Sequence, residues 1–248
     1  MTAALVILAL LGGWELTVRA GGIDPLILPA PSQVAEALWQ DRALLAPDLW
    51  TTTYEVLLGL ALAVAAGVAL ALAMHLFPAL RRALRPLVIG SQAVPVPVIA
   101  PLVILVLGFG LAPKVLLVAL VCFFPITVNL ADGLRAADPD ARRLLRSLDA
   151  TRWQALRFVE APAALPAAFT GLKVAAAVAV IGAVFAEWAG AEEGLGHALL
   201  IANGQLATAR AFAATFLLFL LAIALYGACA LLERRVVDWI PRTGPGGT

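Results

Sequence analysis

The chain has 248 residues, of which 62% are hydrophobic and only 13% are charged, and its mean hydropathy is +0.97. A soluble domain averages about 45–50% apolar and about 25% charged residues, so this composition excludes an ordinary soluble protein. The formal net charge is +1, which gives no overall attraction for nucleic acid. We therefore expect an all-α membrane protein that is surrounded by a lipid bilayer and has no nucleic-acid partner.

A transmembrane helix needs about 20 mostly apolar residues, and six stretches of the chain meet this requirement. They are residues 2–20, 54–77, 86–109, 113–132, 163–188 and 210–232. No aqueous domain is left over, so we expect a single transmembrane domain over residues 1–248. The first stretch lacks a basic N-terminal region and a cleavage site, so it is expected to be a retained span.

Two shorter segments are expected to lie outside the spans on the same side of the membrane. Residues 21–52 hold a helix that starts at Pro31 or Ser32, with Glu36 in its early turns. Residues 190–208 are glycine-rich and contain a short amphipathic stretch from Leu195 to Ile201.

Small residues recur at steps of four in two of the spans, which places each set on one helix face. Such faces let helix backbones approach closely in lipid, within the bundle or at a dimer seam. The two sets are Gly59, Ala63, Gly67 and Ala71, and Gly171, Ala175, Ala179 and Ala183.

The third span contains Pro95, Pro97 and Pro101, which remove helical hydrogen bonds and kink or interrupt the helix. Ser91 and Gln92 add polar groups beside them. The prolines form either the wall of a water-filled path or a packing kink shielded by neighbouring helices.

The fifth span carries two ionisable residues with different expected roles. Lys173 lies about two turns beyond Pro166 and is expected to snorkel to the membrane interface. Glu187 lies near the other end, where interfacial solvation and a role as a gate or substrate contact both remain open. Apart from Lys173, we expect no charge deep inside the spans, which argues against an ion-coupled carrier.

The loop at 133–162 separates the fourth and fifth spans and is rich in arginine. We expect a helix from Pro139, a turn near Asp149 to Thr151, and a second helix around Trp153 that ends before Pro162. Two short helices joined by a bend would make a rigid lever that another protein could grip; an ordinary solvated loop is the alternative.

Orientation follows from the positive-inside rule. Twelve arginines fall in the segments after the second, fourth and sixth spans, and four basic residues fall in the opposite segments. This imbalance predicts that the loop and both termini are cytoplasmic.

The sequence contains no phosphate-binding glycine loop, no metal-ligand spacing and no pair of residues typical of a catalytic site. We therefore expect no cofactor, no metal and no enzymatic activity. Energy for any uphill transport would have to come from a partner that docks on the cytoplasmic side.

The loop resembles the cytoplasmic signature of the permease subunits of bacterial binding-protein-dependent ABC importers. That signature is Glu-Ala-Ala, three residues, Gly, nine residues, then Ile-x-Leu-Pro. This chain has Arg143-Leu144-Leu145 at the start, Asp149 at the glycine position and Val159-Glu160-Ala161-Pro162 at the end. Only the spacing and the proline are kept strictly.

Other segments extend the resemblance from about residue 14 to 235. Leu28-Pro-Ala-Pro-Ser-Gln-Val and Ile181-Gly-Ala-Val-Phe-Ala-Glu-Trp are similar to the nitrate, sulfonate and taurine branch. The segments from Cys122 to Arg135 and from Ile181 to Trp188 are most similar to permeases for thiamine-precursor pyrimidines and riboflavin.

The resemblance implies a type I importer permease of the bacterial inner membrane, with two cytoplasmic ATPases, an extracytoplasmic solute-binding protein and a second permease subunit, expected to be an identical copy. The expected solute is a thiamine-precursor pyrimidine or a related heteroaromatic vitamin; an alkylsulfonate, taurine or nitrate is the alternative. A secondary carrier and a membrane scaffold without transport are further alternatives.

Two sets of site residues follow from these expectations. The residues expected to couple to the ATPase are Arg143, Leu145, Ser147, Asp149, Ala150, Thr151, Arg152, Trp153 and Pro162. The residues expected to line the translocation path are Ser91, Gln92, Pro95, Pro97, Pro101, Phe123, Phe124, Asn129 and Glu187. Phe123 and Phe124 either stack on an aromatic solute or face lipid.

Overall fold

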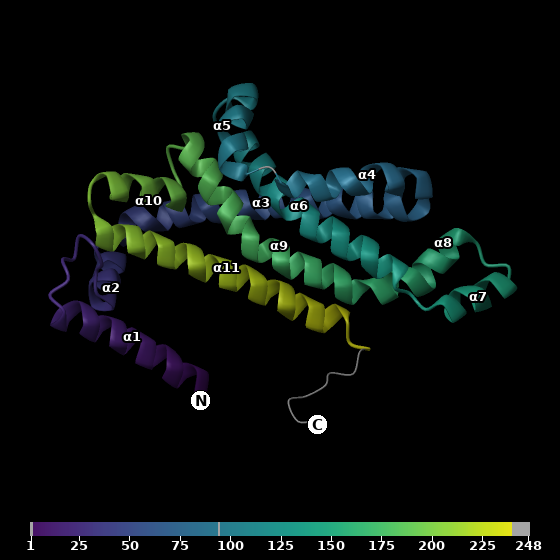
Figure 1. Cartoon of the computed structure of the whole chain (residues 1–248), viewed down its shortest axis with the longest axis horizontal. Helices are drawn as coiled ribbons and strands as arrows, with labels where there is room; N and C mark the ends of the chain where they lie inside the picture. Colours follow the sequence, from purple (N-terminus) through teal and green to yellow (C-terminus); the bar gives the residue numbers. More distant parts are fainter. Residues whose placement is uncertain (1, 94, 240–248) are drawn as a thin grey trace.

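The computed structural model describes residues 2–93 and 95–239, and side chains from residue 5 onward. Every regular element in this part of the chain is a helix, so the expected all-α class is confirmed. Four long helices run lengthwise beside one another (Figure 1): α3 (Arg42–Leu76), α6 (Leu111–Arg135), α9 (Ala161–Gly190) and α11 (Thr208–Val236). α6 packs against both α3 and α9, and α11 packs against α9.

Shorter helices lie at the two ends of this bundle (Figure 1). One end carries α1 (Thr2–Ala20), α2 (Pro31–Gln40) and α10 (Leu195–Gly204). The other end carries α7 (Pro139–Ser147) and α8 (Arg152–Ala155). We call residues 139–155 the elbow, and the two ends of the bundle the α10 end and the elbow end.

The third predicted span takes an unexpected form. α4 (Pro78–Gly90) runs beside α3, a 3₁₀ turn covers Ser91–Ala93, and α5 (Val96–Leu107) projects sideways from the bundle (Figure 1). The two parts meet at an angle of 102°, and Val94 lies outside the described residues. The interruption expected from the prolines is therefore present, but the helix begins at Pro78, within the predicted arginine-bearing loop.

Six spans were predicted, and the described residues contain four helices that could cross a membrane, or five if one bent pair is counted. α3, α6, α11 and the continuous run Arg152–Gly190 are each long and apolar enough to cross a membrane, and α4 with α5 makes a fifth if counted as one bent span. Residues 2–20 do form a helix, α1, but it is not among those that qualify. Its second half carries Glu15 and Arg19, which form an ion pair at 2.5 Å.

Two predicted helix boundaries are wrong. The second span was expected at residue 54, but α3 begins at Arg42 because polar residues continue the helix beyond the apolar stretch. The second loop helix was expected to end before Pro162, but α8 continues through a π-helical turn, Leu156–Glu160, into α9. A proline ring clashes with the carbonyl four residues earlier in an α-helix, and the wider π turn lies where that clash would occur.

The two sets of small residues are confirmed as close-contact faces, and both contact another helix of the same bundle. Every member of both sets is buried, and the two faces pack on α6. A Cβ atom at Gly59 would meet the side chain of Val118, and one at Gly171 would meet the carbonyl oxygen of Pro125 at 2.5 Å. α6 therefore lies between α3 and α9 at distances that only small residues permit.

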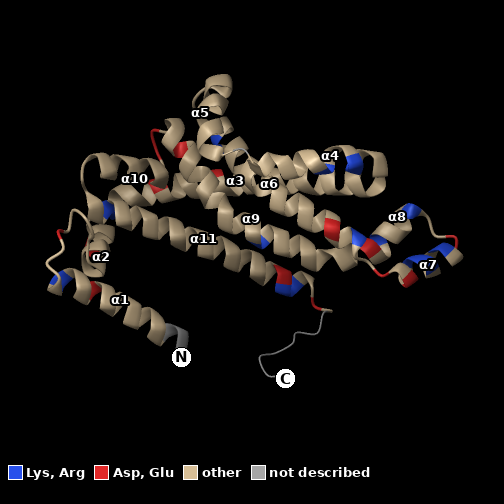
Figure 2. Ribbon diagram, in the orientation of Figure 1, with Lys and Arg blue, Asp and Glu red and all other residues tan. Residues whose placement is uncertain are grey.

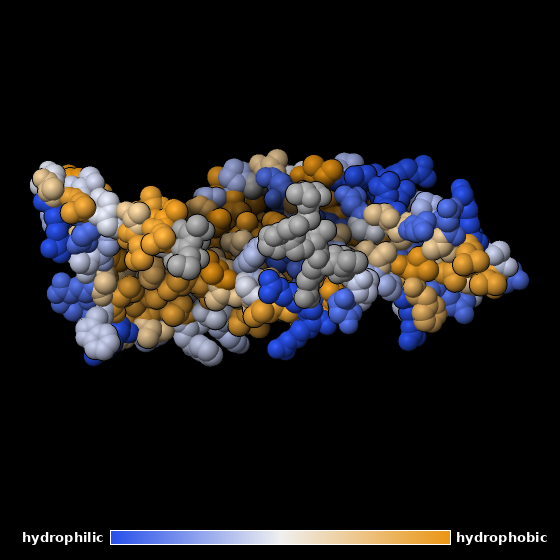
Figure 3. All heavy atoms as spheres, turned by 90° about the horizontal axis from the view of Figure 1, so that it is seen from below, coloured by the Kyte–Doolittle hydropathy of each residue, from blue (hydrophilic) through white to orange (hydrophobic). Residues whose placement is uncertain are grey.

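Charge is sorted along the length of the molecule. Lysine, arginine and acidic residues concentrate at the two ends and on α4, whereas the middle of the bundle carries few (Figure 2). From the side of α1, hydrophobic residues form a broad surface near the α1–α2 end, and at the elbow end they lie among hydrophilic ones (Figure 3). This arrangement is typical of a protein whose middle is in contact with lipid.

Candidate functional site

The elbow is built from local sequence signals. Asp138 caps α7 because its Oδ1 accepts a hydrogen bond from the backbone N–H of Asp140 at 2.8 Å. α7 ends in a turn in which Asp149 has a positive φ of 53°, a conformation that Asp tolerates better than most residues. Thr151 then caps α8 in a reciprocal box with Gln154. The helix–turn–helix expected from Pro139, Asp149 and Trp153 is present.

The elbow is held to the bundle by a polar cluster that the sequence reasoning missed. Arg142 of α7 pairs with Glu160 at 2.8 Å, and the other carboxyl oxygen of Glu160 lies 2.7 Å from Nε2 of His75, at the end of α3. Arg142 also donates to the carbonyl oxygen of Leu134 on α6 at 2.7 Å. Leu134, whose carbonyl oxygen takes part in this cluster, packs its buried side chain with buried Leu156. Arg142 thus joins α7 directly to α6 and to the π-helical turn, and Glu160 extends the cluster to α3.

The surface of the elbow combines exposed apolar and basic side chains. Leu144, Leu148 and Trp153 are between 62% and 68% exposed, and Phe158, three residues beyond the elbow, is 63% exposed. Among the residues expected to contact the ATPase, the following are exposed: Arg143, Ser147, Asp149, Thr151, Arg152 and Trp153. Leu145, Ala150 and Pro162 are half-buried. Large apolar side chains exposed beside charges are typical of a protein–protein contact surface.

The residues expected to line the path fall into two groups. The first surrounds the bend between α4 and α5: Gln92, Pro95, Pro97 and Pro101 are exposed, and half-buried Ser91 donates to the carbonyl oxygen of Val88 at 2.7 Å. The second lies on α6.

Phe123, Phe124 and Asn129 are half-buried on α6. Asn129 donates its side-chain amide to the carbonyl oxygen of Pro125 at 2.7 Å. Their place in a translocation path stays a prediction.

Glu187, the ninth expected path residue, is only 1% exposed, so it is not solvated at the interface. Its carboxyl group accepts hydrogen bonds from Thr52 Oγ1 at 2.7 Å, from the N–H of Gly196 at 2.5 Å and from the N–H of His197 at 3.3 Å. It thereby caps α10 and ties that helix to α3 and α9. Gly194 precedes the capped turn with a φ of 116°, and a Cβ there would meet the Glu187 carboxyl group.

The sequence reasoning missed a buried ion pair at the ends of the second and fourth predicted spans, which does not contradict the expectation of no charge deep inside the spans. Glu55 of α3 and Lys114 of α6 are 1% and 8% exposed, and they form an ion pair at 2.6 Å. Lys173 is also paired, because its ammonium group lies 2.7 Å from the carboxylate of Glu233 near the end of α11; its snorkelling to the interface stays a prediction. Both pairs join residues about 60 positions apart in the sequence, as their separations of 59 and 60 show. No local spacing could have revealed them.

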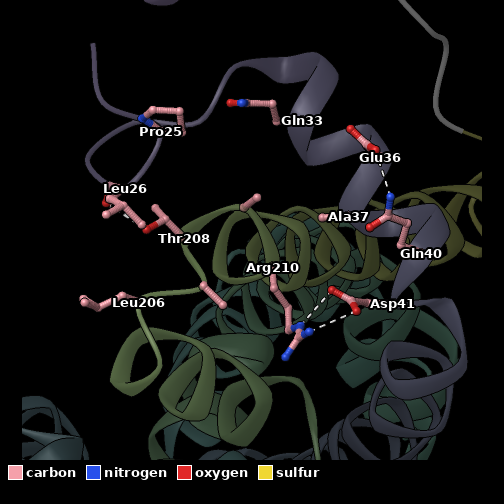
Figure 4. A pocket seen from close by; sticks show the side chains of 12 residues that line it. Pro25, Leu26, Gln33, Glu36, Ala37, Gln40, Asp41, Leu206, Thr208 and Arg210 are labelled. Carbon is pink, nitrogen blue, oxygen red and sulfur yellow. Dashed lines mark hydrogen bonds and ion pairs between the residues drawn. The ribbon is translucent and has the colours of Figure 1, made fainter.

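The α10 end carries a polar pocket of about 440 Å³ (Figure 4). It lies between the segment before α2, α2 itself and the start of α11. Arg210 and Asp41 form a two-bond ion pair in it at 2.7 and 3.1 Å, and Gln40 donates to Glu36 at 2.8 Å. Polar groups that are satisfied by one another make this end of the molecule a rigid surface.

Comparison with known proteins places these features in a family. Residues 62–238 match the family described as "Binding-protein-dependent transport system inner membrane component". The chain is 36% identical to the formylaminopyrimidine transport permease protein ThiX of Halalkalibacterium halodurans, over 95% of this chain and 94% of that protein. It is 38% identical to the riboflavin transport system permease protein RibX of Chloroflexus aurantiacus, over 95% and 88%.

A more distant relative is the taurine transport system permease protein TauC of Escherichia coli, which is 32% identical over 88% of this chain and 82% of that protein. Among solved structures, an inward-facing conformation of the MetNI methionine ABC transporter matches with a TM-score of 0.68 and 18% identity. That match covers 79% of this chain and 97% of the other, which confirms the type I importer permease fold. The chain belongs to the binding-protein-dependent transport system inner membrane components, the multi-pass permease subunits of ABC importers, whose ATP is hydrolysed by a separate ATPase.

Proposed function

We propose that this permease forms the membrane path for a thiamine-precursor pyrimidine or a related heteroaromatic vitamin. The observation that carries the proposal is the similarity to ThiX and RibX, which extends over 95% of the chain in both cases. The names of these two relatives refer to heteroaromatic solutes. In this proposal the whole chain, residues 1–248, acts as one permease domain.

The path lies along α6 and the bend between α4 and α5. Exposed Pro95, Pro97 and Pro101 leave backbone carbonyls without helical partners, and such groups are tolerated at membrane depth only where they line water or protein. Half-buried Phe123 and Phe124 offer ring faces to a flat solute. A second copy of the chain closes the path on the side to which α5 projects.

In this proposal, the elbow receives the force that the partner ATPase generates. The ATPase contacts its exposed apolar and basic residues, with Trp153 and Arg152 at the centre, because Trp and Arg dominate the energetics of protein contacts. α8 continues into α9 without a break in the helical run, so a displacement of the elbow is passed directly to a long bundle helix. Closure of two ATPases would then switch the path between inward- and outward-open states.

The two ends of the bundle face different partners. The elbow and both termini lie in the cytoplasm, as the twelve-to-four distribution of basic residues supports. The α10 end lies outside and receives the solute-binding protein, with the rigid pocket around Arg210 and Asp41 as part of its docking surface. An impermeant thiol reagent tests this: Thr151→Cys should remain unlabelled in intact cells, and Thr208→Cys should be labelled.

The substrate is tested with the cognate solute-binding protein and the permease reconstituted with its ATPase. We expect the binding protein to bind a formylaminopyrimidine or riboflavin, and the vesicles to take it up only when ATP is present. Tight binding of taurine or an alkylsulfonate, with no pyrimidine or riboflavin binding, would favour the alternative that the similarity to TauC supports. Uptake that survives ATP depletion and stops when the proton gradient collapses would identify a secondary carrier.

A further inference from the structure

α4 enters the membrane region from the elbow end. Only Phe77 separates it from the last residue of α3, and α4 then runs back beside α3 (Figure 1). Its first turns carry Arg81, Arg82 and Arg85, and its last turn carries the exposed apolar residues Leu87 and Ile89. Because a helix rises about 1.5 Å per residue, the arginines lie roughly 6–12 Å along the axis from Ile89.

A pocket of about 670 Å³ opens on this helix. Its lining consists of Arg81, Arg82, Arg85, Pro86, Ile89, Gly90 and, from the end of α6, Arg135. Four guanidinium groups therefore border one cavity, and blue residues mark this part of α4 in Figure 2.

The positive charge of this pocket is poorly compensated. The carboxylate of Asp132 lies 3.9 Å from the guanidinium groups of both Arg85 and Arg135, a distance too long for a hydrogen bond. Among the described residues, the side chains of Arg81 and Arg82 take part in no hydrogen bond or ion pair. Four positive groups against one carboxylate leave an excess of about three positive charges facing the cavity.

We propose that this pocket binds the phosphate headgroup of an anionic phospholipid. The guanidinium group is planar and donates two parallel hydrogen bonds to phosphate oxygens, which makes arginine suited to such a group. The apolar residues follow the arginines along α4 in the direction that leads into the bilayer, so Leu87 and Ile89 lie where the acyl chains begin. Basic pockets between membrane helices are known to select anionic headgroups.

This site does not depend on which solute the permease carries. It also differs from the elbow, since its arginines lie on α4 and α6, beside apolar surface that runs into the membrane. Free phosphate shares the headgroup chemistry, but it would gain nothing from Leu87 and Ile89.

The proposal is tested by titrating phosphatidylglycerol into the purified full-length permease and counting bound lipids by native mass spectrometry. Each arginine near a membrane surface contributes about fivefold in affinity for anionic lipid. Arg82→Gln should therefore weaken binding about fivefold, and Arg81→Gln with Arg82→Gln about 25-fold. Arg42→Gln is the control for Arg82→Gln, because Arg42 is also an exposed arginine but lies at the α10 end, away from this pocket, and its replacement should leave the affinity unchanged.

Two further measurements separate the possible ligands and guard against misfolding. Arg81→Lys with Arg82→Lys keeps the charge and should retain most of the preference for phosphatidylglycerol over phosphatidylcholine. Millimolar inorganic phosphate should not displace the lipid. The proposal is overturned if both lipids bind equally, if the double Gln variant keeps its affinity, if phosphate alone displaces the lipid, or if the double variant loses the ATPase and not the lipid.

Discussion

Replacing Glu187 with alanine should destabilise the protein strongly, because this carboxyl group holds the α10 end together. The substitution removes the acceptor of three hydrogen bonds, at 2.7, 2.5 and 3.3 Å. Thr52 keeps a second contact, since its hydroxyl also accepts from the N–H of Leu195 at 2.9 Å. The N–H of Gly196, by contrast, is left buried and unpaired.

A buried group that loses its partner costs about 1–3 kcal/mol, and the longer bond to His197 adds less. The expected loss of unfolding free energy is therefore about 3 kcal/mol. For a chain of this size, each kcal/mol shifts the unfolding midpoint by about 2–4 °C, so Glu187→Ala should lower it by roughly 6–12 °C. Glu187→Gln keeps one acceptor oxygen and should lower it less.

The assay is thermal unfolding of the purified permease in one detergent, followed by tryptophan fluorescence at a fixed scan rate. Glu192→Gln is the matched control: Glu192 is an exposed acid five residues away, and surface changes usually stay within about 0.5 kcal/mol. The reasoning is refuted if Glu187→Ala unfolds at the wild-type temperature and only transport is lost. That result would assign Glu187 to the solute path instead.

Two further predictions concern packing and pairing inside the bundle. Gly59→Ala should lower the unfolding midpoint because the new methyl group would collide with buried Val118, whereas Gly12→Ala, with open space around it, should not; equal effects would contradict the close approach of α3 and α6. A double-mutant cycle on Lys173→Ala and Glu233→Ala should give a coupling free energy of about 1 kcal/mol, and zero coupling would contradict a contribution of this ion pair to stability.

The long apolar helices could be predicted from the sequence because their signal is local. The stretches at 113–132, 163–188 and 210–232 correspond to α6, α9 and α11, since twenty apolar residues have few other stable arrangements. Their ends could not be predicted as well, because polar residues extend a helix without adding to the hydropathy. α3 shows this effect: its first twelve residues precede the predicted span.

The elbow was predictable in outline but not in its attachment. Pro139 and Asp149 are residues whose backbone preferences mark a start and a turn, and both act as expected. Thr151, expected only within the turn, also caps α8. The cluster of Arg142, Glu160 and His75 joins three helices that are distant in the sequence. Its only signal was one histidine and one acid at the margins of apolar spans.

The burial of three ionisable residues could not be predicted either, because it also depends on contacts between helices that are distant in the sequence. Glu55, Lys114 and Glu187 lie near the ends of predicted spans, where exposure to water is the usual expectation. Only the folded arrangement shows that their partners come from other helices. The translocation path was the least predictable feature, because in the proposed assembly its walls include a second subunit.

The most direct test of the coupling account is co-purification of the ATPase with elbow variants. Arg152→Glu with Trp153→Ala removes the exposed aromatic and basic centre of the elbow, and loss of such contacts costs at least about 2 kcal/mol. Trp39→Ala with Arg42→Glu is a matched control, because Arg42 lies over the ring of Trp39 at 4.5 Å at the opposite end. The account predicts that the elbow variant loses the ATPase and ATP-dependent uptake while the control keeps the ATPase bound. An elbow variant that retains both would contradict it.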